Sequence, residues 1–224
     1  MTARQARVGL TQRVVHLSDR DERRDALDQA WVPLLEQIPA VAIPIPNRLA
    51  DPVAFVRDMA IDLLILTGGN DLTHLEGAHD ISPERDHTEG ALLAYAEQRA
   101  VPVLGVCRGM QMLVHHHGGS VERVDGHVAV PHLVASTASG SPSPPLWPVA
   151  HGRTVNSFHG WGVRATGMPS GWHALATAPD GTIEAVAHPT LPLVGIMWHP
   201  ERPDPHPADL ELIVALLYTQ RGPR

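Results

Sequence analysis

Three short, continuous apolar runs constrain the fold of this chain more than any other feature of its sequence. They are Ile61–Leu66, Val101–Val106 and Leu191–Trp198, and each leads into a segment containing Gly, Cys or His-Pro. Such runs are too short and too uniformly apolar for amphipathic helices, so they predict buried parallel strands. Val8–Leu10 predicts a further strand.

Helical patterns lie between the predicted strands. The segment Asp21–Ala30, extended by Trp31, predicts a helix that Pro33 either breaks or restarts. Apolar stripes at helical spacing predict helices over Arg85–Arg99 and Pro207–Thr219. Strands that alternate with helices indicate an α/β fold, a single doubly wound, mostly parallel sheet flanked by helices, with ligands at the carboxyl ends of the strands.

We expect residues 1–224 to form a single domain. The proline-rich segment Ser136–Pro148 predicts a mobile surface loop, but strand patterns resume after it and are needed to complete the sheet. The net charge of −7 argues against a nucleic-acid partner, which requires a basic face. The one cysteine excludes a disulfide within the chain. Without a leader-like apolar run or a membrane-length stretch, we expect a soluble cytoplasmic protein with no membrane partner. The oligomeric state stays open, and a homodimer is compatible with the sequence.

The best candidate for a nucleophile is Cys107, in the segment Gly105-Val106-Cys107-Arg108-Gly109. This segment follows a predicted strand and precedes a helical pattern over Met110–His117, the arrangement of a strand-to-helix elbow. A helix N-terminus favours the thiolate form, and the amide N–H of Arg108 is a candidate oxyanion donor. A buried, unreactive cysteine is the alternative, but the flanking glycines and Gln111 favour a reactive one.

A Gly-Gly turn and a His-Pro-Glu segment follow two other predicted strands. The turn at Gly68-Gly69 lets the backbone approach a ligand closely, and Gly69 is the candidate for the second oxyanion donor. An ordinary strand-end turn is the alternative. His199 is the candidate base, with Glu201 to orient it. No zinc-binding spacing is present, so we expect no catalytic metal.

Together these motifs resemble the class I glutamine amidotransferase-like superfamily, and more narrowly the γ-glutamyl hydrolases grouped with γ-glutamyl-γ-aminobutyrate hydrolase. The resemblance is carried by LTGGNDL, PVLGVCRGMQML, VNSFHGWGV, DGTIEAVAHP and GIMWHPERP. It implies a triad of Cys107, His199 and Glu201 and oxyanion donors at Gly69 and Arg108. It further implies a glutamyl pocket, with the candidates Gly68, Asn70, Gln111, His127, Ser157, Phe158 and His159.

Further segments resemble the subgroup of γ-glutamyl-CDP-amidate hydrolases, which serve the phosphoramidate decoration of bacterial capsules. These segments are GLTQR near the start, RDALDQAW, TGGNDL, ERD before the helix, HVAVPH, VNSFH and IMWHPER. The resemblance implies a small-molecule γ-glutamyl substrate and no cofactor. A nucleotide amidate needs extra positive charge for its phosphates, and the candidates are Arg13, Arg23, Arg24 and Arg202. Each of these has a second interpretation as an ordinary surface charge.

Four functions compete at this stage. A free-standing hydrolase is favoured, because the whole triad is present without an appended synthetase domain. The alternatives are a glutaminase subunit that passes ammonia to a separate synthetase, a hydrolase of γ-glutamyl amines, and a non-catalytic ligand-binding relative. The intact triad argues against the last.

Overall fold

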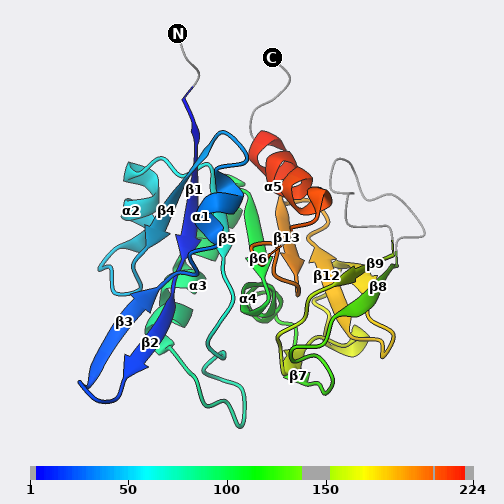
Figure 1. Cartoon of the computed structure of the whole chain (residues 1–224). Helices are drawn as coiled ribbons and strands as arrows, with labels where there is room; N and C mark the ends of the chain where they lie inside the picture. The colour runs from blue at the N-terminus through cyan, green and yellow to red at the C-terminus, as the bar shows by residue number, and fades with distance from the viewer. Residues whose placement is uncertain (1–3, 138–151, 204, 220–224) are drawn as a thin grey trace.

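A nine-stranded mixed sheet with helices on both faces forms the centre of the computed structural model, which describes residues 4–137, 152–203 and 205–219 (Figure 1). The strands lie in the order β4 (Ala40–Ile45), β1 (Ala6–Thr11), β5 (Leu63–Leu66), β6 (Val103–Val106), β13 (Leu193–Ile196), β12 (Ile183–Ala187), β11 (His173–Thr177), β8 (His132–Ser136) and β9 (Arg153–Val155). The predicted α/β fold class is therefore confirmed.

The sheet divides into a parallel and an antiparallel part. β4, β1, β5, β6 and β13 pair in parallel, and β1, β5, β6 and β13 are the four strands that the sequence predicts. The pairs from β13 through β12, β11 and β8 to β9 are antiparallel. Since β6 and β13 are parallel neighbours, the segments that follow them leave the sheet at the same edge.

Two apolar layers pack the helices against the sheet. α1 (Trp31–Leu35) and α5 (Pro207–Thr219) cover one face, and α2 (Pro52–Asp58), α3 (Pro83–Arg99) and α4 (Arg108–His116) cover the other (Figure 1). In β5, Leu63 and Ile65 join the first layer, whereas Leu64 and Leu66 join the second. This alternation follows from the two-residue period of a strand, and it explains why β5 is apolar throughout.

The predicted helix over Asp21–Ala30 is wrong. β2 (Arg13–Leu17) and β3 (Glu22–Ala26) form an antiparallel hairpin here, with Arg13 opposite Ala26. Glu22–Asp25 is exposed along its whole length, so this segment has no apolar face to pack as a helix. Pairing with β2 satisfies its backbone instead, and α1 begins only at Trp31.

The other predicted helices are confirmed as α3, α4 and α5. A second small sheet joins β7 (Glu122–Arg123) to β10 (Trp161–Gly162), and a short 3-10 turn, η1, spans Ala165–Gly167. Most of the loop predicted at 136–148 lies outside the described residues. Among the helices that the structure describes, none combines the length and apolar character that crossing a membrane requires.

Candidate active site

Cys107 lies in the sharp turn between β6 and α4. Its backbone has φ 53° and ψ −107°, a conformation that residues other than glycine rarely adopt. Such strain at a single residue is typical of functional sites, where the surrounding structure maintains it. The amide N–H of Cys107 donates to the carbonyl oxygen of Ile196 at 2.7 Å and ties the turn to β13.

The two glycines that flank this turn are required by close packing. A Cβ atom at Gly105 would lie 2.5 Å from the carbonyl oxygen of Gly109. A Cβ atom at Gly109 would overlap the carbonyl group of Leu66 at the end of β5. Both positions therefore need glycine for a direct steric reason, because β5, β6 and α4 meet here without room for side chains.

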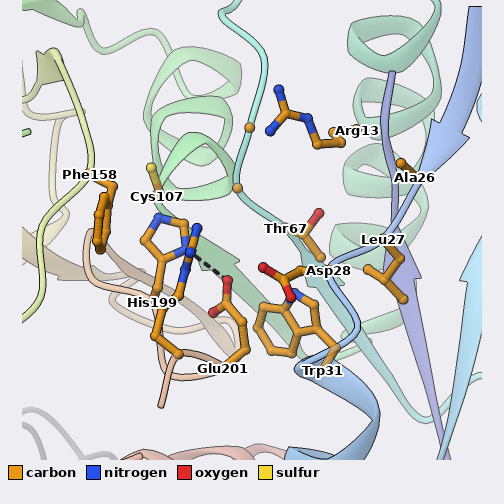
Figure 2. A pocket seen from close by; sticks show the side chains of 13 residues that line it. Arg13, Ala26, Leu27, Asp28, Trp31, Thr67, Cys107, Phe158, His199 and Glu201 are labelled. Atoms are coloured by element: carbon orange, nitrogen blue, oxygen red, sulfur yellow. Dashed lines mark hydrogen bonds and ion pairs between the residues drawn. The ribbon is translucent and has the colours of Figure 1, made fainter. Parts of the chain in front are cut away.

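His199 follows β13 and lies beside Cys107 (Figure 2). Nδ1 of His199 is 2.8 Å from Oε1 of Glu201, and both side chains are buried. Asn156 accepts a hydrogen bond from the N–H of His199 and donates one to its carbonyl oxygen, both at 2.9 Å. The sequence motifs did not indicate this role for Asn156. The histidine is thus fixed by its own backbone as well as by the carboxylate.

The charge of His199 is set by its two neighbours. Burial lowers its pKa, but the interactions with Cys107 and Glu201 outweigh burial and raise the pKa to about 10. At neutral pH the ring is therefore an imidazolium, with one N–H directed to Glu201. Its Nε2 is buried and has no hydrogen-bond partner among the described residues, so it remains available to a reacting group.

The Gly68-Gly69 turn lies next to the same histidine. A Cβ atom at Gly68 would lie 2.6 Å from Cε1 of His199, so only glycine fits there. Gly69 has φ +84°, which favours glycine for conformational reasons. Both glycines line the cavity that contains Cys107.

A buried arginine that sequence reasoning missed fixes the direction of this turn. Arg85, on α3, donates to the carbonyl oxygens of Thr67 at 2.5 Å, Gly68 at 3.1 Å and Gly69 at 2.6 Å. In a trans peptide the carbonyl and the following N–H point in opposite directions. The contact to Gly68 therefore turns the N–H of Gly69 away from Arg85.

Arg85 is connected to the residue after the nucleophile through Glu89. Oε1 of Glu89 accepts from Nε of Arg85 at 2.8 Å, and Oε2 accepts from the guanidinium of Arg108. Thr11 donates to the same carboxylate at 2.7 Å, and Asp86 binds the other side of Arg108. Burial raises the pKa of Glu89, but the two arginines lower this pKa by more than burial raises it, so the carboxylate stays ionised. This network couples the two segments that carry the predicted oxyanion donors.

Two adjoining cavities open at Cys107. The larger, of about 300 Å³, extends toward Asp28, Trp31 and Arg202, and Figure 2 shows the side chains that surround it. The smaller, of about 200 Å³, extends toward Gln111 and Trp161. Four residues line both cavities, namely Arg13, Gly69, Cys107 and Phe158.

Comparison with known proteins decides the family. Residues 8–201 match the Peptidase C26 family. The chain belongs to the Peptidase C26 family. It is thus an enzyme of a cysteine peptidase family whose relatives are named γ-glutamyl hydrolases, within the class I glutamine amidotransferase-like group.

Two relatives and one solved structure illustrate this membership. The γ-glutamyl-CDP-amidate hydrolase of Campylobacter jejuni subsp. jejuni serotype O:2 is 29% identical over 87% of this chain and 90% of its own length. The γ-glutamyl-γ-aminobutyrate hydrolase of Escherichia coli O157:H7 is 32% identical over 71% of this chain and 72% of its own length. A glutamine amidotransferase from Thermotoga maritima shares the fold with a TM-score of 0.64 at 17% identity, over 89% and 77% of the two chains.

The residues predicted for the glutamyl pocket of this Peptidase C26 chain divide into two groups. Gly68 lines the larger cavity, Asn70, Gln111 and His159 line the smaller, and Phe158 lines both. His127 and Ser157 line neither cavity.

Asn70 and Ser157 are engaged within the protein. The side chain of Asn70 exchanges hydrogen bonds with the backbone of Val14 at 2.8 and 2.9 Å and so holds β2. Oγ of Ser157 donates to the carbonyl oxygen of His127 at 2.6 Å. In the smaller cavity, Nε2 of Gln111 donates to the carbonyl oxygen of Trp161 at 3.0 Å.

Of the four arginines proposed for phosphate binding, two line the cavities at Cys107 and two do not. Arg13 and Arg202 line the larger cavity, where Arg13 pairs with Asp80 at 3.1 Å and Arg202 lies over the ring of Phe158. Arg23 pairs with Glu84, and Arg24 pairs with Glu22 on the exposed hairpin, so neither lines the cavities at Cys107. This placement could not be predicted because the hairpin itself was not.

Proposed function

We propose that this chain hydrolyses the γ-glutamyl amide bond of a small molecule, with Cys107 as the nucleophile. The observation that carries the proposal is the juxtaposition of Cys107, in its strained turn, with His199, whose Nδ1 is held 2.8 Å from Glu201. A thiol, an imidazole and an orienting carboxylate in this order are what nucleophilic catalysis of acyl transfer requires.

The reaction proceeds in two steps. The thiolate of Cys107 attacks the γ-carbonyl carbon, and the imidazolium of His199 donates its proton to the leaving nitrogen. The glutamyl group remains on Cys107 as a thioester, which water, deprotonated by His199, then hydrolyses to free glutamate. The N–H groups of Gly69 and Arg108 stabilise the oxyanion in both steps.

The two cavities suit the two parts of such a substrate. The smaller one takes the glutamyl group, because Asp71 and Asp80 supply acceptors for an α-ammonium group. The larger one takes the leaving group. The scissile bond then lies at Cys107, where the two cavities meet.

The favoured substrate class is a γ-glutamyl nucleotide amidate of the γ-glutamyl-CDP-amidate type, in the synthesis of a capsule phosphoramidate. Two observations support this choice. The relative named for that substrate covers nearly the whole chain at 29% identity. The larger cavity is lined by Arg13 and Arg202, two guanidinium groups that suit phosphate oxygens.

A substrate panel tests the proposal. Release of glutamate would be measured from a γ-glutamyl nucleotide amidate, from γ-glutamyl-γ-aminobutyrate and from glutamine, with Cys107→Ala as the inactive control. We expect the highest kcat/KM for the amidate. Hydrolysis of glutamine that rises only when a synthetase is added would favour the glutaminase alternative. Wild-type rates in Cys107→Ala would remove this cysteine from the mechanism altogether.

A further inference from the structure

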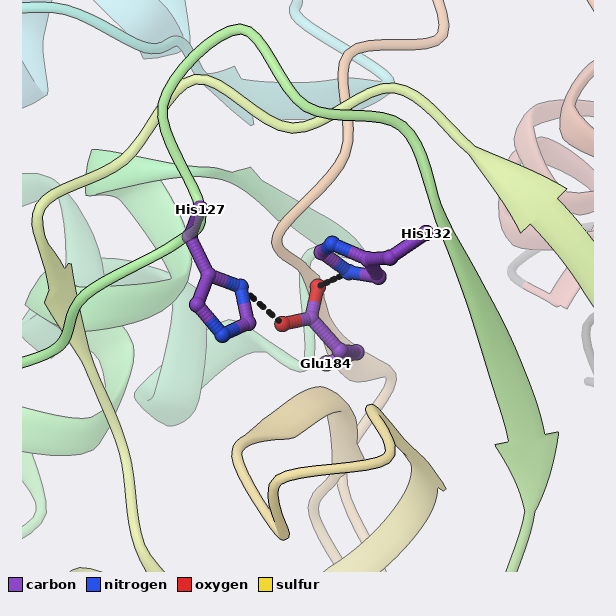
Figure 3. Close-up of side chains that lie close together, drawn as sticks. All are labelled: His127, His132 and Glu184. Carbon is purple, nitrogen blue, oxygen red and sulfur yellow. Dashed lines mark ion pairs between the residues drawn. The ribbon is translucent and has the colours of Figure 1, made fainter.

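A second group of polar side chains converges away from Cys107. His127 lies between β7 and β8, His132 is the first residue of β8, and Glu184 lies on β12. Both rings face the carboxylate of Glu184 (Figure 3). Glu184 is fully buried, His127 is 4% exposed and the side chain of His132 is 12% exposed.

The nitrogen and oxygen atoms that face one another in this cluster lack hydrogen bonds within the described residues. Nδ1 of His127 is 3.4 Å from Oε1 of Glu184, and Nε2 of His132 is 3.4 Å from Oε2. Within the described part of the chain, none of these four atoms forms a hydrogen bond. Burying a carboxylate in this condition is costly, so a ligand that satisfies all of them at once would be bound favourably.

The separations fit ligands around a metal better than they fit hydrogen bonds. An N–H···O bond usually brings nitrogen and oxygen to about 2.7–3.2 Å. Two ligand atoms held at about 2.0–2.1 Å from a tetrahedral ion lie about 3.4 Å apart. One atom from each of His127, His132 and Glu184 lies within 4.8 Å of the others. We infer that these three residues bind a divalent transition metal ion, zinc by the chemistry of the donors.

The surroundings of His127 support a ligand role for its Nδ1. Its other ring nitrogen, Nε2, lies 3.3 Å from Oδ2 of Asp180, which also accepts from Thr182 at 2.7 Å and from Arg164 at 3.1 Å. A proton on Nε2 directed to Asp180 leaves the lone pair of Nδ1 free to face Glu184. Metal-binding histidines commonly have such a carboxylate on the far nitrogen. The tautomer that binds metal is therefore the one that Asp180 selects.

The ion would stiffen one wall of the cavities at Cys107. His127 is bonded to the neighbouring segment through its carbonyl oxygen, which accepts from the N–H of His159 at 3.0 Å and from Oγ of Ser157 at 2.6 Å. Phe158, between these two residues, lines both cavities. Nε2 of His159 lies 3.5 Å from Oε1 of Glu184 and borders the site. The role is structural, because the cluster does not include Cys107.

Metal binding to the full chain tests this inference. Protein stripped with a chelator would be titrated with Zn²⁺ against a chromophoric chelator, and with Co²⁺ to record the visible bands of a tetrahedral site. The parent for these titrations is Cys107→Ala, because Cys107 with His199 could itself hold zinc. We expect one tight site per chain and a rise in the midpoint of thermal unfolding on adding Zn²⁺.

Matched variants assign the site. His132→Ala should weaken zinc binding by more than about 100-fold and abolish the thermal shift, since a ligand should matter at least as much as its outer partners. His117→Ala is the matched control, because it removes a histidine that lies 3.3 Å from Glu97 and outside the cluster. It should leave the zinc affinity and the thermal shift unchanged. Asp180→Asn, at a half-exposed position, should weaken binding about 10- to 100-fold. If His132→Ala does not fold, Asp180→Asn decides. No zinc binding by the parent, or parental affinity in Asp180→Asn and any folded His132→Ala, would overturn the inference.

Discussion

Arg85 donates a hydrogen bond from Nη1 to the carbonyl oxygen of Gly68 at 3.1 Å, and this contact fixes the peptide unit whose N–H belongs to Gly69. The guanidinium is fully buried, and its Nε donates to Glu89, which also binds Arg108. One arginine thereby orients the turn next to His199 and connects it to the residue that follows Cys107. Arg85 is a positioning residue, since it lines neither cavity.

We therefore expect Arg85→Lys to lower kcat about 10- to 100-fold with a much smaller effect on KM. Loss of a direct oxyanion donor lowers kcat by about 10²–10³-fold, and a misdirected donor should retain part of its effect. A lysine keeps the charge but cannot reach the three carbonyl groups at once. Steady-state kinetics provides the measurement, and Arg99→Lys at the exposed end of α3 is the control. An unchanged kcat in folded Arg85→Lys would show that the network only supports the fold.

The close approach of Gly68 to His199 gives a second prediction. In Gly68→Ala the new methyl group would meet Cε1 of His199 at 2.6 Å and push the ring away from Cys107. A displacement of about 1 Å at a reacting group costs about 100-fold in rate, so kcat/KM should fall by about that factor. In Gly90→Ala the nearest atom to the new methyl is 3.7 Å away, and this variant should keep wild-type kinetics. Equal kinetics in the two variants would contradict the placement of His199.

The raised pKa of His199 predicts an alkaline limit on activity. The leaving nitrogen needs the proton of the imidazolium, so kcat/KM should be sustained at neutral pH and should fall as the pH rises through about 10. Glu201→Gln removes one of the two groups that raise this pKa, so the alkaline limb should move to lower pH. We expect this variant to be impaired but measurable, and His199→Ala to be nearly inactive. If the alkaline limb of the pH–rate profile is the same in wild type and Glu201→Gln, Glu201 does not contribute to the raised pKa of His199.

The positions of the arginines predict substrate-dependent effects. Arg202→Ala should raise KM for a γ-glutamyl nucleotide amidate about tenfold, the loss of one charge-assisted contact of about 1.5 kcal/mol. Arg13→Ala should act in the same direction. KM for glutamine should hardly change in either variant, because its leaving group carries no phosphate. Arg24→Ala, on the exposed hairpin, is the matched control for a lost arginine charge. Equal losses on amidate and glutamine would mean that these arginines serve the fold.

Four of the five parallel strands, β1, β5, β6 and β13, could be predicted because they are buried on both faces, whereas β4 at the edge of the sheet is partly exposed and was not predicted. Their apolar runs leave no other interpretation, and the turns that follow them carry glycines with steric reasons such as Gly109. His199 and Glu201 could be predicted because they follow directly on such a strand. The hairpin of β2 and β3 could not be predicted, because the exposed residues Glu22–Asp25 show neither the two-residue period of a strand nor the period of a helix.

The other features that could not be predicted from the sequence depend on contacts between distant segments. Arg85 and Glu89 are charged residues on a helix, and a charged residue in such a pattern is normally exposed. Only the approach of α3 to the Gly68-Gly69 turn buries them. The cluster of His127, His132 and Glu184 likewise draws on elements more than 50 residues apart, so no local spacing indicates a metal site.

The most direct measurement of the central claim is the mass of the protein during turnover. Wild type and Glu201→Gln would be mixed with the γ-glutamyl substrate, quenched in acid and analysed by intact-protein and peptide mass spectrometry. We predict an added glutamyl group on the peptide that contains Cys107, lost on treatment with hydroxylamine and absent from Cys107→Ala. Turnover with no adduct on this peptide, together with near wild-type activity in Cys107→Ala, would contradict the account.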